Sequence, residues 1–330
     1  MRTTTHLLAA TTGVAALALS ACGVSNTTGG SGDGAYPAGN VEMYVGASAG
    51  GSSDLISRAV SKGLSDELDA SFPVINLEGA NGALAANKVS KAKADGQTIA
   101  IQNASLFAIT PLAVSEDEVT DLDDFDVVQG VSRDDYVMVT GPKSGFKTLD
   151  DIKAAKKKVT YGTTGVGTGA QLSCGLTYGS AGVEAEAVPF DGGAPALTAV
   201  LGNQVDTACL QVGEAIENIE SGKLTPLSVF GPERVDYLPD VPTAKEQGLD
   251  VEVAQYRFMT VPKGTPDSVK DAIAEAMQAT FKTEAYQAFN EQNSLTPMEI
   301  SGDEVVTQLE EDRKRFADLV DQYGLNLGAS

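Results

Sequence analysis

From residue 40 onward, short apolar stretches alternate with segments whose apolar residues recur at helical spacing. Val41, Met43 and Val45 alternate with other residues as in a strand, and Ser52-Ser53-Asp54 then opens an amphipathic helix. The pattern predicts a β-α-β-α-β unit with a strand at 41–45, a helix at 52–68, a strand at 73–77, a helix at 83–93 and a strand at 96–102.

The same alternation returns in the second half of the chain. It predicts a strand at 158–162, a helix at 171–178, a strand at 185–189, a helix at 195–201 and a strand at 205–211. Alternating strands and helices are typical of α/β domains with a parallel-rich sheet. We therefore predict two α/β domains, with segments 136–140 and 256–262 carrying the chain from the first to the second and back. The predicted domains are 40–139 plus 257–330, and 140–256.

Several helix ends are marked by local signals. Thr148 with Asp151, and Thr243 with Glu246, have the spacing of a capping box, and Gly248 suits the end of the second of these helices. Thr265-Pro266 predicts another helix with proline at its first position. Apolar residues from 305 to 323 predict a long amphipathic helix, and the acidic residues 115–126 a solvated surface loop.

The N-terminus has the pattern of a bacterial lipoprotein signal. Residues 7–19 are almost wholly apolar, too few to span a bilayer, and end in Leu19-Ser-Ala-Cys22. We expect a signal peptide at 1–21, lipidation of Cys22, and a flexible tether at 22–39 rich in glycine, serine and threonine. The alternative is an ordinary secretory signal with a chance cysteine. The lipidated chain would be extracytoplasmic and held at the membrane by Cys22.

Composition excludes several kinds of function. A formal net charge of −22 opposes binding to nucleic acid. The single histidine, His6, lies in the predicted signal, so imidazole-based catalysis and histidine-ligated metal sites are excluded from the mature chain. Cys174 and Cys209 are an even pair in an exported chain, which favours a disulfide, the alternative being two separately buried small side chains.

Two glycine-rich turns, at 46–54 and 163–169, each lie between a predicted strand and helix. Glycine lets the backbone approach a ligand, and free amides at a helix start attract anions such as carboxylates. Neither turn matches a nucleotide-binding motif. Such turns also occur for purely geometric reasons, but two in matching positions predict a ligand cleft between the domains.

Several sequence blocks together resemble the substrate-binding proteins of tripartite tricarboxylate transporters, the Bug or TctC-like family. The blocks are Tyr36-Pro37, Ala49-Gly-Gly-Ser-Ser-Asp54, Glu78-Gly-Ala-Asn-Gly82, Ala94-Asp-Gly-Gln-Thr98, Tyr161-Gly-Thr-Thr-Gly-Val-Gly167, Val188-Pro-Phe-Asp-Gly-Gly-Ala-Pro-Ala196, Leu201-Gly-Asn-Gln-Val-Asp206, Leu238-Pro-Asp-Val-Pro-Thr243 and Val261-Pro-Lys-Gly-Thr-Pro266. The match extends over roughly residues 36–325.

The resemblance implies a monomeric type II periplasmic-binding-protein fold, a two-domain "Venus flytrap". Such a receptor holds a small carboxylate, of the citrate, tricarboxylate or dicarboxylate class, and delivers it to a two-subunit membrane permease. It implies no cofactor and no protein metal site. The ligand-lining residues implied by position are Ser48, Ala49, Gly50, Gly51, Ser52, Ser53, Asn103, Ala104, Ser105, Thr163, Thr164, Gly165, Val166, Gly167, Thr168, Asp191, Gly192, Gln211 and Tyr256.

The chain departs from the family pattern at three places that bear on specificity. The small residues Ala47-Ser48-Ala49 replace an often aromatic or proline-rich first turn. Leu210-Gln211 stands near the position where the family commonly has an acidic or amide residue, and Gln255-Tyr256-Arg257 replaces a frequent tryptophan. Arg257 is either a second anion contact or a surface or hinge arginine.

Two rival functions differ in what they require of the chain. An exported enzyme with Ser52 or Ser53 as nucleophile needs a lysine base, but no Ser-x-x-Lys stands at either turn. A ligand sensor feeding a membrane signalling system would need the same binding cleft as a transport receptor.

Overall fold

The computed structural model describes residues 36–328. The predicted signal peptide and the predicted lipidation site at Cys22 lie outside the described residues. Within the described part of the chain, every helix falls short of the length and apolarity needed to cross a membrane.

The first predicted β-α-β-α-β unit is present. Strands β1 (Glu42–Val45), β2 (Val74–Asn76) and β3 (Thr98–Asn103) form a parallel sheet with β1 in the middle. Helix α1 (Ser52–Leu68) connects β1 to β2, and α2 (Ala83–Ser90) connects β2 to β3. Successive side chains of β1 enter different cores, Met43 one and Tyr44 another, as the two-residue period of a strand requires.

The second unit is also present. Strands β5 (Val159–Thr163), β6 (Ala185–Pro189) and β7 (Thr207–Gln211) are parallel, with β5 in the middle. Helices α5 (Gly169–Ala181) and α6 (Gly193–Leu201) provide the crossovers. In both units the loops after the strands' carboxyl ends lead into helices, which is where α/β proteins place ligands.

Two long antiparallel strands join the units into one sheet, in the order β2-β1-β3-β9-β4-β7-β5-β6. Residues 125–135 of β4 (Phe125–Thr140) pair with β9 (Ala254–Pro262), whereas residues 136–140 pair with β7 and with β8 (Thr225–Val229). The short strand β10 (Thr296–Pro297) also pairs with β4. The change of partners falls at Asp135/Tyr136, close to the predicted boundary at 139/140, and the domain boundaries themselves remain a prediction.

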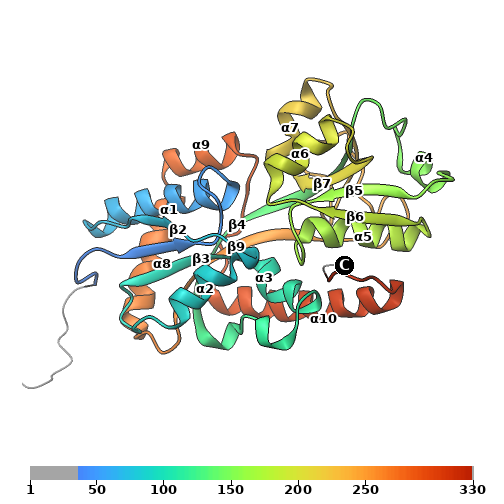
Figure 1. The fold of residues 1–330 in the computed structure, drawn as a ribbon. Helices are drawn as coiled ribbons and strands as arrows, with labels where there is room; N and C mark the ends of the chain where they lie inside the picture. The colour runs from blue at the N-terminus through green and yellow to red at the C-terminus, as the bar shows by residue number, and fades with distance from the viewer. Residues whose placement is uncertain (1–35, 329–330) are drawn as a thin grey trace, which may run out of the picture. The chain divides into compact units, whose positions relative to one another are not determined.

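Helices cover the sheet in three groups. Helices α1, α8 (Asp267–Phe281) and α9 (Glu284–Gln292) pack on one face of the first unit, and α6 and α7 (Val212–Glu220) pack on the second. The predicted C-terminal helix is α10 (Gly302–Tyr323), which contacts both α3 (Ala104–Ala108) and α5 (Figure 1). One apolar core, to which α2, α3, α5 and α10 contribute, therefore runs beneath both units.

The helix start predicted at Thr148 is confirmed, whereas the one predicted at Thr243 is wrong. Thr148 caps the short helix α4 (Leu149–Lys153) with the predicted box. Thr243 and Glu246 exchange the same two hydrogen bonds, 2.8 and 3.0 Å, yet residues 244–248 form only a turn. Gly248, at φ +81°, stops the chain after one turn, too short for a helix.

Two smaller details also differ from the sequence prediction. Pro266 is the N-cap of α8 and not its first helical residue. The acidic segment 115–126 contains two 3₁₀ turns, η3 (Glu116–Glu118) and η4 (Leu122–Asp124), and its buried Phe125 already begins β4. Two further 3₁₀ turns, η1 (Ala80–Gly82) and η2 (Thr110–Leu112), lie beside the site described next.

Candidate ligand-binding site

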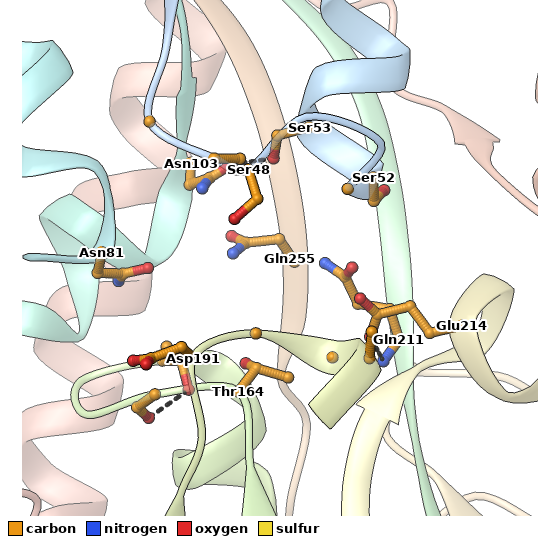
Figure 2. Close-up of a pocket in the computed structure, with 18 of the residues that line it drawn as sticks. Ser48, Ser52, Ser53, Asn81, Asn103, Thr164, Asp191, Gln211, Glu214 and Gln255 are labelled. Atoms are coloured by element: carbon orange, nitrogen blue, oxygen red, sulfur yellow. Dashed lines mark hydrogen bonds between the residues drawn. The ribbon is translucent and has the colours of Figure 1, made fainter. Parts of the chain in front are cut away.

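Both predicted glycine-rich turns line a single cleft of about 1220 Å³. In Figure 2, Ser48, Ser53 and Asn103 from the first unit face Asp191, Thr164 and Glu214 from the second, and Gln255 lies between them. The predicted ligand residues that line the cleft are Ser48, Ala49, Gly50, Gly51, Ser52, Ser53, Asn103, Thr164, Gly165, Val166, Thr168, Asp191, Gly192 and Gln211.

The start of α1 offers unused amides to this cleft. Gly51 is the N-cap and provides no side-chain cap, and the first intrahelical bond runs from the Leu55 amide to the Gly51 carbonyl, 3.0 Å. The amides of Ser52, Ser53 and Asp54 therefore have no acceptor within the helix. Together with the positive end of the helix dipole, they form a site for an anion such as a carboxylate.

The turn before α1 is shaped by its own hydrogen bonds. The Gly50 amide donates to Asp54 Oδ2 at 2.8 Å, and the Gly51 amide donates to the Ser48 carbonyl at 3.0 Å. Gly50 has φ +83°, a conformation that suits glycine. Burial acts to raise the pKa of Asp54, but its bonds to Arg58, Gly50 and Asn76 prevail and lower it. Gly50 and Gly51 thus position the free amides of Ser52 and Ser53 without offering their own.

A buried ion pair lies beside these amides. Arg257 on β9 places Nη1 2.6 Å from Asp134 Oδ2 on β4, and both side chains are almost fully buried although they line the cleft. Arg257 Nε donates to Ser53 Oγ at 2.8 Å, and Ser53 Oγ donates to Asn103 Oδ1 at 3.0 Å. Ser52 Oγ donates to Asp134 Oδ2 at 3.0 Å. Arg257 is therefore an internal residue of the cleft and not a surface arginine.

The ion pair retains unused hydrogen-bonding capacity. Asp134 Oδ1 is buried and makes no hydrogen bond to any of the described residues. Buried polar atoms are normally satisfied, so an acceptor without a partner in a cleft indicates a place for a polar ligand. Asp134 Oδ1 suits a hydrogen-bond donor, whereas Arg257 Nη1 is already engaged by Asp134 Oδ2 at 2.6 Å.

The second glycine-rich turn differs from the first because the helix that follows it has a side-chain cap and the turn makes further internal hydrogen bonds. Thr168 caps α5, its Oγ1 accepting from the Gln171 amide at 3.3 Å and donating to the Gly165 carbonyl at 2.9 Å. The Gly167 amide donates to Gln171 Oε1 at 2.8 Å. The second unit therefore lacks, at this turn, the uncapped helix start that α1 provides.

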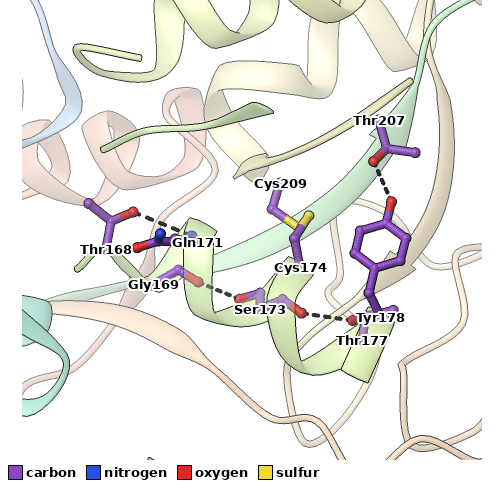
Figure 3. Close-up of a disulfide and its surroundings, with 9 residues drawn as sticks. All are labelled: Thr168, Gly169, Gln171, Ser173, Cys174, Thr177, Tyr178, Thr207 and Cys209. Atoms are coloured by element: carbon purple, nitrogen blue, oxygen red, sulfur yellow. Dashed lines mark hydrogen bonds between the residues drawn. A yellow bond between two sulfur atoms is a disulfide. The ribbon is translucent and has the colours of Figure 1, made fainter. Parts of the chain in front are cut away.

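A disulfide fixes the helix behind this turn. Cys174 on α5 is bonded to Cys209 on β7, with 5.9 Å between the Cα atoms (Figure 3). Both cysteines are fully buried, and one helical turn further on the Tyr178 hydroxyl bonds to Thr207 of the same strand. The start of α5, which presents Thr168 to the cleft, is thus tied to the central strands of its unit.

Glu214 brings a carboxylate to the second side of the cleft. It is the third residue of α7, and its Oε2 accepts from the Gln211 amide at 3.3 Å in a capping box. The same carboxylate lies against Gly193, where an added Cβ would come 2.1 Å from Oε1. Gly193 begins α6, which has no side-chain cap. Burial, with a smaller contribution from Asp134, raises the pKa of Glu214 to about 7, although the bond from the Gln211 amide and the charge of Arg257 both act to lower it.

Five predicted ligand residues do not line the cleft: Ala104, Ser105, Thr163, Gly167 and Tyr256. Ser105 lies behind Gln255, whose side chain accepts from its amide and donates to its hydroxyl. Tyr256 points to α10, where its hydroxyl donates to Asp312 at 3.1 Å. Neighbouring residues on a strand face opposite ways, which explains why Gln255 and Arg257 reach the cleft and Tyr256 does not.

The sequence prediction did not name several cleft residues as ligand contacts, among them Asn81, Asp134, Glu214 and Gln255. Asn81 Nδ2 donates to the Gly167 carbonyl at 3.2 Å, and so connects the first unit to the second turn. For Glu214 the signal was present, because Gln211 and Glu214 have capping-box spacing directly after a strand. Among residues 36–328 we find no group of three or more histidine, cysteine or acidic side chains arranged to hold a metal ion.

Comparisons with known proteins agree with this architecture. The model of the "Tripartite tricarboxylate transporter family receptor" family matches residues 56–325. An Agrobacterium vitis relative, the UPF0065 protein in the TAR-I ttuE-ttuC' intergenic region, is 32% identical over 255 residues, covering 75% of this chain and 72% of the relative.

Two solved structures share the fold. That of the periplasmic binding protein BugD has a TM-score of 0.79 and 25% identity, covering 89% of this chain and 100% of BugD. That of R. palustris Rpa4515 with adipate has a TM-score of 0.82 and 23% identity, with the same coverage. With more than half of its length matched by the family model, this chain belongs to the tripartite tricarboxylate transporter receptor family.

Proposed function

We propose that this chain is a receptor lipoprotein, anchored at Cys22, that captures a small carboxylate in the cleft and delivers it to a two-subunit membrane permease. The observation that carries the proposal is the uncapped start of α1, whose free amides open into the cleft beside the buried ion pair of Arg257 and Asp134.

The first unit supplies the donors that a carboxylate requires. The amides of Ser52 and Ser53 would bind one end of the ligand, with the Arg257 guanidinium as a charged group next to them. The pairing of Arg257 with Asp134 keeps the guanidinium in place in the empty cleft, so little reorganisation is needed when a ligand binds.

Contacts from the second unit would close around the ligand. Thr164, Asp191 and Gln211 line the opposite side of the same cleft, and Asn81 and Thr110 both donate to the Gly167 carbonyl, at 3.2 and 3.1 Å. A ligand that touches both sides would favour the arrangement in which these bonds form.

Delivery to a permease and lipid anchoring rest on the family membership and on the sequence of residues 1–22. A structural neighbour determined with adipate, a six-carbon dicarboxylate, supports a small carboxylate as the ligand class. Uptake tests the transport role: deleting the gene should abolish uptake of the bound carboxylate. Unchanged uptake with loss of a transcriptional response would instead identify a sensor.

Binding is tested by a thermal-shift screen of the purified chain with succinate, glutarate, adipate, citrate, glutamate and 4-aminobutyrate. A ligand present at 100 times its Kd should stabilise the fold by about 2.7 kcal/mol. Ser53→Ala removes a bond that holds Arg257 and should weaken binding, whereas Ser65→Ala, on the same helix but outside the cleft, should not. If no carboxylate shifts the transition, the proposed function is wrong.

A further inference from the structure

The charges that line the cleft are unequal. Five carboxylates and one guanidinium line it, and that guanidinium is already paired with one of the five. The carboxylates belong to Glu78, Glu118, Asp134, Asp191 and Glu214. Glu78, Glu118 and Asp134 belong to the first unit, and Asp191 and Glu214 to the second. A ligand that carries only negative charge would therefore find donors at α1 but would be repelled by carboxylates from both units.

Glu214 occupies the place in the second unit where a second ligand carboxylate would bind. The uncapped start of α6 is another helix terminus that lines this cleft, and the Glu214 carboxylate already lies against its first residue, Gly193. The start of α7 is capped by the same side chain through the Gln211 amide. The positive ends of the α6 and α7 helix dipoles are therefore both next to the carboxylate of Glu214.

Two features of the cleft point to a ligand with two kinds of group. The amides at the start of α1 are donors without acceptors in the helix, and Asp134 Oδ1 is a buried acceptor without a partner among the described residues. A carboxylate would satisfy the amides of α1. A group that carries N–H donors would satisfy Asp134 Oδ1, and Glu214 would balance its charge.

We infer that the ligand is a zwitterion, an ammonium carboxylate, with its carboxylate at the start of α1 and its ammonium between Asp134 and Glu214. Glu214 is then the residue that selects this class over dicarboxylates. The inference rests on the proposed function, because it concerns the far end of a ligand whose carboxylate binds at α1.

The ionisation of Glu214 provides a second way to test the inference. The titratable or charged groups near the Glu214 carboxylate are Asp134 and Tyr136 on β4 and Arg257 on β9. Asp191, which precedes α6, lines the same cleft. A ligand ammonium would lower the Glu214 pKa from about 7, so binding at pH 7 would release protons. A dicarboxylate would raise the pKa, and its binding would take protons up.

The test is isothermal titration calorimetry of the whole chain with matched sets: succinate, aspartate and β-alanine, then glutarate, glutamate and 4-aminobutyrate. We expect an amino-bearing member to bind at least about 10-fold more tightly than its dicarboxylate, a difference of about 1.4 kcal/mol. The titrations are made at pH 7 in phosphate and in Tris, whose ionisation enthalpies differ. The difference between the two binding enthalpies should show that protons are released.

Glu214→Gln keeps an acceptor for the Gln211 amide but removes the charge. It should reduce the preference for the amino-bearing ligand at least about 10-fold and abolish proton release. Glu217→Gln, an equal charge change at an exposed position of the same helix, should do neither. Tighter binding of the dicarboxylate, or proton uptake on binding, would refute the zwitterion inference but would agree with the proposed carboxylate receptor. If no compound of either set binds, both the inference and the proposed function are wrong.

Discussion

Replacing Arg257 tests the buried ion pair on which the site is built. Arg257→Gln removes the guanidinium and leaves Asp134 buried, with Ser52 Oγ as its remaining hydrogen-bond partner among the described residues. Breaking one side of a buried ion pair costs about 3–5 kcal/mol, because an uncompensated charge stays behind. We therefore expect Arg257→Gln to lower the free energy of unfolding by about that amount without ligand.

A double substitution separates the cost of the orphaned charge from the loss of packing. In Arg257→Gln/Asp134→Asn no charge is left unpaired, so the double variant should be more stable than the sum of the two single changes predicts, by about 2–3 kcal/mol. A matched control is Arg234→Gln, whose ion pair with Glu246 is about half exposed on both sides. Exposed pairs contribute about 0.2–1 kcal/mol, so this change should be small.

The assay is equilibrium unfolding in urea, with the transition midpoint and slope compared among five proteins: the unchanged chain, Arg257→Gln, Asp134→Asn, the double variant and Arg234→Gln. In thermal unfolding, the single Arg257 variant should melt roughly 10 °C lower. The reasoning is refuted if Arg257→Gln costs no more than Arg234→Gln, or if the two single changes at the ion pair are additive.

Three further predictions concern the framework of the site. Replacing both cysteines by serine should lower the free energy of unfolding by roughly 3–4 kcal/mol, since the disulfide closes a loop with a sequence separation of 35; equal urea midpoints for the two proteins would contradict this. Gly46→Ala should disrupt the first turn, because its Cβ would lie 2.3 Å from the Gly82 Cα, whereas Gly39→Ala meets nothing within 4 Å; equal melting temperatures would count against the close approach. Because the folded-state pKa of Glu214 is raised to about 7, the folded chain holds its proton longer and stability should fall as pH rises from about 4.5 to 7. Glu214→Gln should reduce that decline in a pH series of urea titrations, and an unchanged slope would show that the pKa is not raised.

The parts of the fold that depend on residues close together in the sequence were predictable from the sequence. Alternation at Val41, Met43 and Val45 follows from the two faces of β1, and Ser52-Ser53-Asp54 forms the first turn of α1, where the sequence placed it. The two β-α-β-α-β units were found for the same reason. The box at Thr243 shows the limit of local signals, because the hydrogen bonds form while Gly248 allows only one turn.

The chemistry of the cleft depends on contacts between distant residues. Asp134 and Arg257 meet because β4 and β9 are antiparallel neighbours with a set register, which no local pattern specifies. Glu214 reaches Gly193 because α6 and α7 start at the same edge of the sheet. We expected the two glycine-rich turns to offer free amides in the same way. They differ because the Thr168 side chain caps α5 and accepts a hydrogen bond from the Gln171 amide.

The most direct test of the account is a crystal structure of the chain with the strongest binder from the calorimetric sets. We predict a ligand carboxylate within about 3 Å of the amide nitrogens of Ser52 and Ser53. A carboxylate bound instead at the turn 163–169, or a ligand outside the cleft, would contradict the assignment of α1 as the anion site.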